Sequence, residues 1–139
     1  MLMPFRRMRG LSSPSGLGRV IVADPDESAY AMVRQLTAPD RWEVRYVGTS
    51  EELREALRSG PAQLALVNLS LLDEELSEEL SEELMERSRR GLRVVIVADE
   101  HNELNERRAR VLSPVFYAPK PVQMGVLNEV VQGALKIAV

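Results

Sequence analysis

From Arg19 onward, the sequence alternates short apolar runs with longer segments in which apolar residues recur every three to four positions. The apolar runs predict buried strands, and the periodic segments predict amphipathic helices. The predicted strands are 20–23, 43–47, 64–69, 93–98 and 115–117. The predicted helices are 26–36, 49–60, 73–90, 99–112 and 122–137. Five strand–helix units in succession predict an α/β protein with a parallel five-stranded sheet and helices on both of its faces.

The first 18 residues differ from the rest of the chain in composition. They contain Arg6, Arg7 and Arg9, several Ser, Gly and Pro residues, and no acidic residue. A transit peptide has a similar composition. A secretory signal peptide is excluded because no apolar core follows the arginines. Segments rich in Gly, Pro and Ser rarely bury enough apolar surface to fold. We therefore interpret residues 1–18 as a flexible basic arm and residues 19–139 as one domain.

Charge is distributed unevenly along the chain, whose formal net charge is −3. Residues 73–86 hold eight acidic side chains and no basic one, so the remainder of the chain is net basic. Within this acidic tract, a repeat of Glu-Glu-Leu-Ser places Leu76, Leu80 and Leu84 in a slanted row along the predicted helix. We expect the acidic side chains to lack basic partners one helical turn away and to repel one another.

Two interpretations of the acidic tract remain open. It is either the solvated outer face of a helix whose leucines enter the core, or a surface that binds a basic protein segment. That segment belongs to a partner with a basic surface or to the chain's own arm. On the second interpretation, the candidate interaction residues are Glu75, Glu79 and Glu83.

The residue content excludes several classes of function. The chain has no Cys and one His, His101, so we expect no disulfide, no thiol catalysis, no metal site and no Ser–His catalytic pair. No apolar run approaches the roughly 18 residues of a membrane span, and the arginines form no patch interleaved with aromatic residues for nucleic acid. We expect a soluble protein that is not an enzyme, has no cofactor or metal, and does not bind nucleic acid or membranes.

Polar residues stand at the carboxyl ends of the predicted strands, where α/β sheets collect their functional groups. These positions are Asp24, Pro25 and Asp26 after the first strand, Asn68 at the third, Ala98 and Asp99 at the fourth, and Lys120 and Pro121 after the fifth. Asp24 should face Lys120 beside the neutral Asn68, which predicts a pocket whose charges balance without a metal ion. Asp26 and Asp99 are interpreted as caps of the helices that follow them. For Asp99 a second interpretation stays open, because an acid near Lys120 could share its charge.

With these residues the chain resembles the receiver domain of bacterial two-component response regulators, which has a flavodoxin-like (βα)5 fold: a doubly wound parallel sheet in a three-layer α/β/α arrangement. The resemblance covers about residues 19–139 and rests on spacing. Asn68 lies 44 residues after Asp24, Ala98 lies 30 residues further, and Lys120 lies 22 beyond that. Tyr117, three residues before Lys120, stands where the family carries its switch aromatic residue.

The resemblance implies a site that this chain lacks in part. In the family, an Asp that ends the third strand accepts a phosphoryl group, acidic side chains hold a divalent metal, and a Ser or Thr and a Lys bind the phosphoryl oxygens. An amide is a poor nucleophile beside a carboxylate, so phosphorylation is not expected. We therefore predict a degenerate phosphorylation pocket formed by Asp24, Pro25, Asp26, Asn68, Ala98 and Lys120.

Without phosphorylation, the resemblance implies a cytoplasmic bacterial signalling protein, a stand-alone pseudo-receiver that acts as a protein–protein adaptor. Its surface would be the fourth helix, fifth strand and fifth helix, and it would bind another protein or a second copy of itself. The candidate residues on this face are Leu104, Arg107, Tyr117, Met124 and Val126. Two alternatives remain: a true phosphoreceiver that uses a displaced Asp26 or Asp73, and a binder of flavin or another small ligand.

Overall fold

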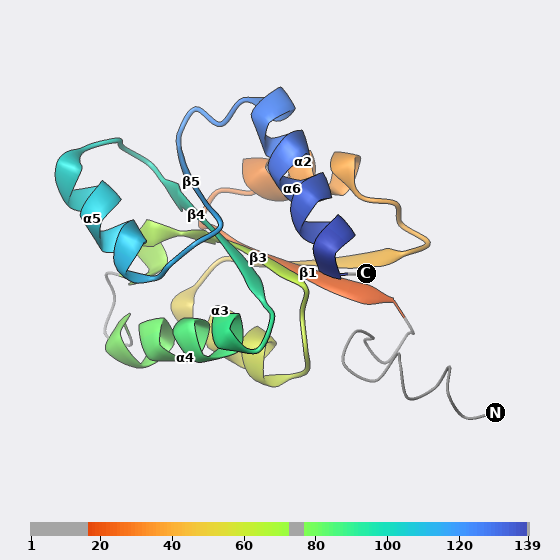
Figure 1. Ribbon diagram of the computed structural model, residues 1–139, viewed down its shortest axis with the longest axis horizontal. Helices are drawn as coiled ribbons and strands as arrows, with labels where there is room; N and C mark the ends of the chain where they lie inside the picture. The colour runs from red at the N-terminus through yellow and green to blue at the C-terminus, as the bar shows by residue number, and fades with distance from the viewer. Residues whose placement is uncertain (1–16, 73–76, 139) are drawn as a thin grey trace.

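The computed structural model describes residues 17–72 and 77–138, in which helices cover both faces of a five-stranded sheet (Figure 1). The strands are β1 (Gly18–Ala23), β2 (Trp42–Val47), β3 (Leu64–Asn68), β4 (Arg93–Ala98) and β5 (Phe116–Pro119). The helices are α2 (Ser28–Leu36), α3 (Ser50–Arg58), the short 3-10 helix η1 (Leu69–Leu72), α4 (Ser77–Arg89), α5 (Glu103–Val111) and α6 (Met124–Ala138).

All strand pairs are parallel, and the strand order is β2-β1-β3-β4-β5. The chain therefore winds outward from β1 in one direction and then in the other, which confirms the doubly wound, flavodoxin-like fold. Asn68 pairs with Val97, and Ala98 pairs with Pro119. Because of this register, the residues that end β3, β4 and β5 lie at one edge of the sheet.

Alternate residues of the strands enter two separate hydrophobic layers. In β1, Ile21 packs in the layer under α3, α4 and α5, whereas Val20 and Val22 pack in the layer under α2 and α6. The helices fill the first layer with Leu53, Leu57, Leu80 and Leu84, and the second with Val33, Leu127, Val131 and Leu135. Both faces of the sheet are thus buried, which explains why its inner strands are apolar throughout rather than alternating.

Local signals in the sequence fix several element ends. The side-chain oxygen of Thr49 accepts a hydrogen bond of 3.1 Å from the backbone N–H of Glu52, as expected of the residue that caps α3. Gly91 follows α4 with φ of 113°, a conformation that residues with a side chain rarely adopt. At the fourth helix, however, the cap is Asn102, whose side chain accepts from the N–H of Asn105. The predicted start at Asp99 is therefore wrong.

The described part of the acidic tract is α-helix, as predicted. A helix over 73–90 is expected from the sequence, and α4 covers Ser77–Arg89 of that range, after β3 has led first into η1. Residues 73–76, which include Leu76 of the predicted leucine row, lie outside the described residues. Leu80 and Leu84 are 0% and 1% exposed, so these two leucines enter the core as predicted.

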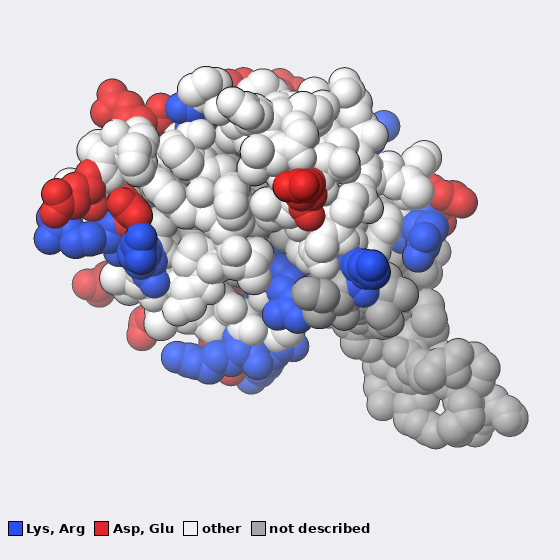
Figure 2. Space-filling model, turned by 45° about the horizontal axis from the view of Figure 1, so that its top comes forward, with Lys and Arg blue, Asp and Glu red and all other residues white. Residues whose placement is uncertain are grey.

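The surface is charged unevenly. Figure 2 shows charged side chains of both signs gathered on the side of α5, while the surface over α6 is mostly uncharged. Among residues 17–72 and 77–138, no helix combines the length and the apolar character that crossing a membrane requires.

Two leucines on neighbouring helices test how much the layer under α4 contributes to stability. Leu80→Ala empties a fully buried position, so we expect the free energy of unfolding to fall by about 2–5 kcal/mol. Leu104→Ala, at a position 60% exposed, should change it by less than about 0.5 kcal/mol. Urea denaturation followed by circular dichroism measures both values, and equal losses would contradict this account of the core.

Candidate functional site

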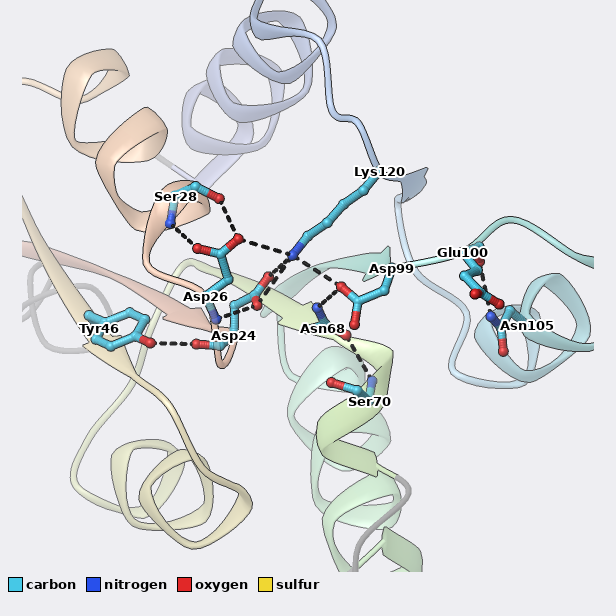
Figure 3. A network of polar contacts seen from close by, with 10 residues as sticks. All are labelled: Asp24, Asp26, Ser28, Tyr46, Asn68, Ser70, Asp99, Glu100, Asn105 and Lys120. Carbon is cyan, nitrogen blue, oxygen red and sulfur yellow. Dashed lines mark hydrogen bonds and ion pairs between the residues drawn. The ribbon is translucent and has the colours of Figure 1, made fainter.

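The side chains of Asp24, Asp26, Asp99 and Lys120 meet at the carboxyl edge of the sheet (Figure 3). The ammonium nitrogen of Lys120 lies 3.2 Å from Oδ2 of Asp24 and 3.1 Å from Oδ1 of Asp99. It lies 3.9 Å from Oδ2 of Asp26. One cation therefore joins the loops that follow β1, β4 and β5.

Asn68 brings β3 into the same network. Its Nδ2 donates a hydrogen bond of 3.0 Å to Oδ1 of Asp99, and its Oδ1 accepts one of 2.8 Å from the backbone N–H of Ser70. The side chain is 1% exposed, so both of these bonds form out of water. Asp99 Oδ1 is consequently shared between the Asn68 amide and the Lys120 ammonium.

The loop after β1 is ordered by its own carboxylates. Oδ1 of Asp24 accepts from the N–H of Asp26 at 2.9 Å, and Oδ1 of Asp26 accepts from the N–H of Ser28 at 3.0 Å. The Ser28 hydroxyl donates to Oδ2 of Asp26. The residue that caps α2 is Glu27 and not Asp26 as predicted, although Asp26 holds the first residue of the helix through these bonds. The hydroxyl of Tyr46 on β2 donates to the backbone carbonyl of Asp24 at 2.6 Å, a contact that sequence reasoning did not predict.

These contacts shift the pKa values of the site. The hydrogen bond from Asn68 and then the Lys120 ammonium lower the pKa of Asp99 against the effect of its partial burial. Burial lowers the pKa of Lys120, but Asp99 and Asp24 outweigh burial and leave that pKa raised. Hydrogen bonds from Ser28 lower the pKa of Asp26. The charged forms of Asp26, Asp99 and Lys120 are therefore favoured.

The expected charge balance between Asp24 and Lys120 is wrong because Asp99 is a third carboxylate in the cluster. Asp99 does not cap α5, and its side chain turns instead toward Asn68 and Lys120. The contact between Asp99 and Lys120 could have been predicted from the sequence. Asp99 directly follows β4, Lys120 directly follows β5, and these two strands are neighbours in the sheet. The cluster carries three carboxylates and one ammonium.

Ala98 and Pro25, the other two residues of the predicted pocket, add no polar side chain to the cluster. Ala98 is 1% exposed and has no hydroxyl, and Pro25 is exposed on the loop after β1. Within the described ranges, no group of three or more His, Cys, Asp or Glu side chains is placed to hold a metal ion. The carboxylates of Asp24 and Asp99 instead contact the Lys120 ammonium, so this donor set does not fit the divalent ion that the resemblance implies.

Tyr117, on β5, turns its ring toward the layer under α5. Its hydroxyl is buried without a hydrogen-bond partner among the described residues, and burial, followed by the charge of Glu106, raises its pKa. The ring centroid of His101 lies 6.0 Å away. The peptide bond between Lys120 and Pro121 is cis.

The expectation that the acidic side chains lack basic partners one helical turn away is wrong for Glu83 and Glu86, and Glu79 pairs with an arginine of another helix. The ion pairs are Glu79 with Arg54 (3.0 Å), Glu83 with Arg58 (3.1 Å) and Arg87 (3.0 Å), and Glu86 with Arg89 (3.1 Å) and Arg90 (3.0 Å). Glu79 and Glu83 therefore join α4 to α3. The sequence predicts them as contacts for a partner, but in the structure both are paired with arginines of the same chain. Glu75 lies outside the described residues.

The predicted interaction face of α5, β5 and α6 exposes apolar side chains. Leu104 is 60% exposed, Met124 is 37% and Val126 is 38%. Arg107 is exposed one helical turn after Leu104 on α5, with its Nη2 4.0 Å from a carboxylate oxygen of Glu103. The helix α5 buries only Ala109 among its own residues, so most of its surface remains available.

Solved structures similar to this chain include receiver domains. A CheY-like receiver domain protein from Methanospirillum hungatei JF-1 is 23% identical, with a TM-score of 0.68 over 86% of this chain and 94% of that one. A receiver protein from Pseudoalteromonas atlantica is 21% identical (TM-score 0.68; 87% and 99% covered). A receiver domain of a two-component histidine kinase from Clostridium thermocellum is 17% identical (TM-score 0.70; 86% and 98% covered). No family model and no curated protein sequence matches the chain, so the likeness concerns the fold.

The lowered pKa of Asp99 gives the site a measurable pH dependence. A carboxyl whose pKa is lowered by folding adds stability above its usual pKa of 3.8, and this stability is lost as the pH falls through the lower value in the folded state. We expect Asp99→Asn to be less stable than the wild type at neutral pH, and the difference to shrink on acidification. Urea denaturation at a series of pH values measures it.

The matched control for this measurement is Asp40→Asn. It removes the same charge at an exposed position that has no ion pair with any residue the structure describes. Its stability difference from the wild type should stay constant with pH. A parallel pH dependence in both variants would show that net charge, and not the contact with Asn68 and Lys120, is responsible.

Proposed function

We propose that this chain is a pseudo-receiver: a receiver-like signalling domain that acts through contacts with other proteins and does not accept a phosphoryl group. One observation carries the proposal. Asn68 stands at the end of β3, where receiver domains carry their phosphoacceptor, and its buried amide is hydrogen-bonded through both its nitrogen and its oxygen. A carboxamide in these contacts is a poor nucleophile for phosphoryl transfer.

The contacts of Lys120 support the same conclusion. A Lys at this position binds phosphoryl oxygens in receiver domains, but here its ammonium lies 3.2 Å from Asp24 and 3.1 Å from Asp99. An incoming phosphate would have to displace Asp99 and would meet three negative side chains around one cation. The pocket therefore disfavours the anion that an active receiver must stabilise.

A displaced acceptor has less support. Both carboxylate oxygens of Asp26 accept hydrogen bonds from Ser28, which commits this side chain to the start of α2. Asp73, the other candidate, lies outside the described residues. Neither carboxylate has the position at the end of β3 on which the resemblance rests.

The face formed by α5, β5 and α6 is the surface we propose for the protein partner, which is another protein or a second copy of this chain. Leu104, Met124 and Val126 expose apolar surface there, and Figure 2 shows few charges over α6. Apolar side chains gathered on one face are typical of contact surfaces. In this proposal the domain works by binding, with no catalytic activity and no cofactor of its own.

Treatment with a small-molecule phosphodonor and Mg²⁺ tests the proposal. We expect the intact mass of the wild-type chain to remain unchanged, because the acceptor position is an amide. An active receiver domain treated in parallel verifies the donor. A gain of one phosphoryl group by the wild-type chain would overturn the proposal, and peptide mapping would identify the carboxylate that received it.

The same treatment of Asn68→Asp tests the surroundings of the acceptor. This change replaces the Nδ2 donor to Asp99 by a second carboxylate oxygen, so the two acids repel each other. We expect little phosphorylation of Asn68→Asp alone, and more when Asp99→Asn and Ala98→Thr are added. Full phosphorylation of the single variant would show that Asp99 and Ala98 do not limit the site.

A further inference from the structure

A groove lies between α4 and α5, on the side of α4 that faces away from α3. It is open to solvent and has a volume of about 410 Å³. Its lining residues are Leu69, Leu72, Glu78, Ser81, Glu82, Arg108, Val111 and Leu112. None of these residues belongs to the cluster around Lys120 or to the predicted interaction residues on α6, although Leu69 and Arg108 also line the pocket at Asn68 and Asp99.

The floor of the groove is apolar and continues to the surface. Leu69, Leu72 and Leu112 are nearly fully buried beneath it. Val111, at the end of α5, is 68% exposed, the most exposed of the large apolar side chains in the described residues. An apolar floor with an exposed apolar rim is the kind of surface that holds side chains of a peptide.

Two acidic residues that flank this floor form no ion pair with any residue that the structure describes. Glu78 and Glu82 stand one helical turn apart on α4, both are exposed, and neither has an ion pair with any described residue. In contrast, Glu79 and Glu83 are neutralised by arginines of α3. The charges of α4 are therefore divided between a side that is paired within the fold and a side, at the groove, that is not.

Arg108 is the single basic residue that lines the groove. Its guanidinium lies 3.5 Å from the side-chain oxygen of Asn105 on its own helix. The groove thus presents two glutamates, one arginine and an apolar floor, and its net charge is negative. Its chemical complement is a segment in which apolar and basic residues alternate and acids are absent.

We propose that the occupant is the chain's own N-terminal arm, residues 1–16. Its sequence begins Met-Leu-Met-Pro-Phe-Arg-Arg-Met-Arg and contains no acid. Phe5 and Met8 supply apolar side chains for the floor, and Arg6, Arg7 and Arg9 supply cations for Glu78 and Glu82. This complementarity of charge and apolar pattern is what identifies the arm as the ligand.

The arm is long enough to reach the groove of its own molecule. It continues from Leu17, directly before β1, at the edge of the sheet opposite the Lys120 cluster. An extended chain covers about 3.3 Å per residue, so the 12 residues between Phe5 and Leu17 span up to about 40 Å. The route along one strand of about 20 Å and across two strand spacings of about 5 Å each is about 30 Å. The remaining length must carry the arm around the sheet, because Leu17 lies on the α2 side with Arg34 and Trp42.

A nitroxide attached to the arm tests this contact in the full-length chain. The sequence has no Cys, so Ser12→Cys provides one labelling site. We expect the amide NMR signals of Ser81, Glu82 and Val111 to lose most of their intensity in the labelled protein and to recover when the label is reduced. High salt should weaken the loss because the contact is partly electrostatic. No loss at these residues would overturn the proposal.

Two double variants test whether the contact depends on the charges of the groove or on the net charge of the protein. Glu78→Gln with Glu82→Gln should abolish the signal loss. Glu51→Gln with Glu55→Gln, an equally spaced exposed pair on α3, should leave it unchanged. Equal effects of the two pairs would overturn the assignment of the groove.

A mixed sample distinguishes the chain's own arm from that of a second copy. Isotope-labelled protein without the nitroxide is mixed with unlabelled protein that carries it. We expect no signal loss in this mixture, because the arm binds within its own molecule. A loss at the same residues would overturn the intramolecular contact and indicate exchange of arms between copies. None of these outcomes depends on phosphorylation, so they are independent of the proposed function.

Discussion

The contacts of the Lys120 ammonium hold the functional edge of this protein together. Its partners follow β1 and β4, while Lys120 itself follows β5, and Asn68 adds β3 by donating to the same Asp99 oxygen. Asp24 is 2% exposed, and a buried carboxylate is stable only with a counter-charge and hydrogen bonds. Loss of Lys120 would leave Asp24 buried without its cation, so the geometry of the surrounding loops depends on this one residue.

The identity of residue 68 follows from these contacts. An amide at this position can donate to Asp99 while it accepts from Ser70, and a carboxylate can do only the second. The neutral side chain therefore permits a carboxylate directly after β4, close to Lys120. Compared with the receiver pattern that the sequence resembles, negative charge is absent at the end of β3, while the carboxylate of Asp99 lies beside Lys120. The amide of Asn68 and the carboxylate of Asp99 are therefore best understood together, because each contacts the other.

The sequence predicts the sheet and the edge on which the site lies, because buried strands leave clear apolar runs and the polar residues stand directly after them. It does not predict where the Asp99 side chain points, since an Asp before a helix can cap it or turn toward a neighbouring strand. It also does not predict the pairs of Glu79 and Glu83 with Arg54 and Arg58, which lie 25 residues earlier. Both errors concern side chains whose partners are set by packing between elements.

The ion pairs between α3 and α4 divide the acidic tract into two parts. The glutamates on the side of α4 toward α3 are neutralised by arginines, and those on the side toward α5 are not. α5 adds only Ala109 of its own residues to the core, so its position depends on few apolar contacts. A segment bound between α4 and α5 would supply apolar contacts that α5 lacks and would also meet the unpaired glutamates. Occupancy of the groove would then influence the adjoining face of α5, β5 and α6, and so connect the arm to the surface proposed for partners.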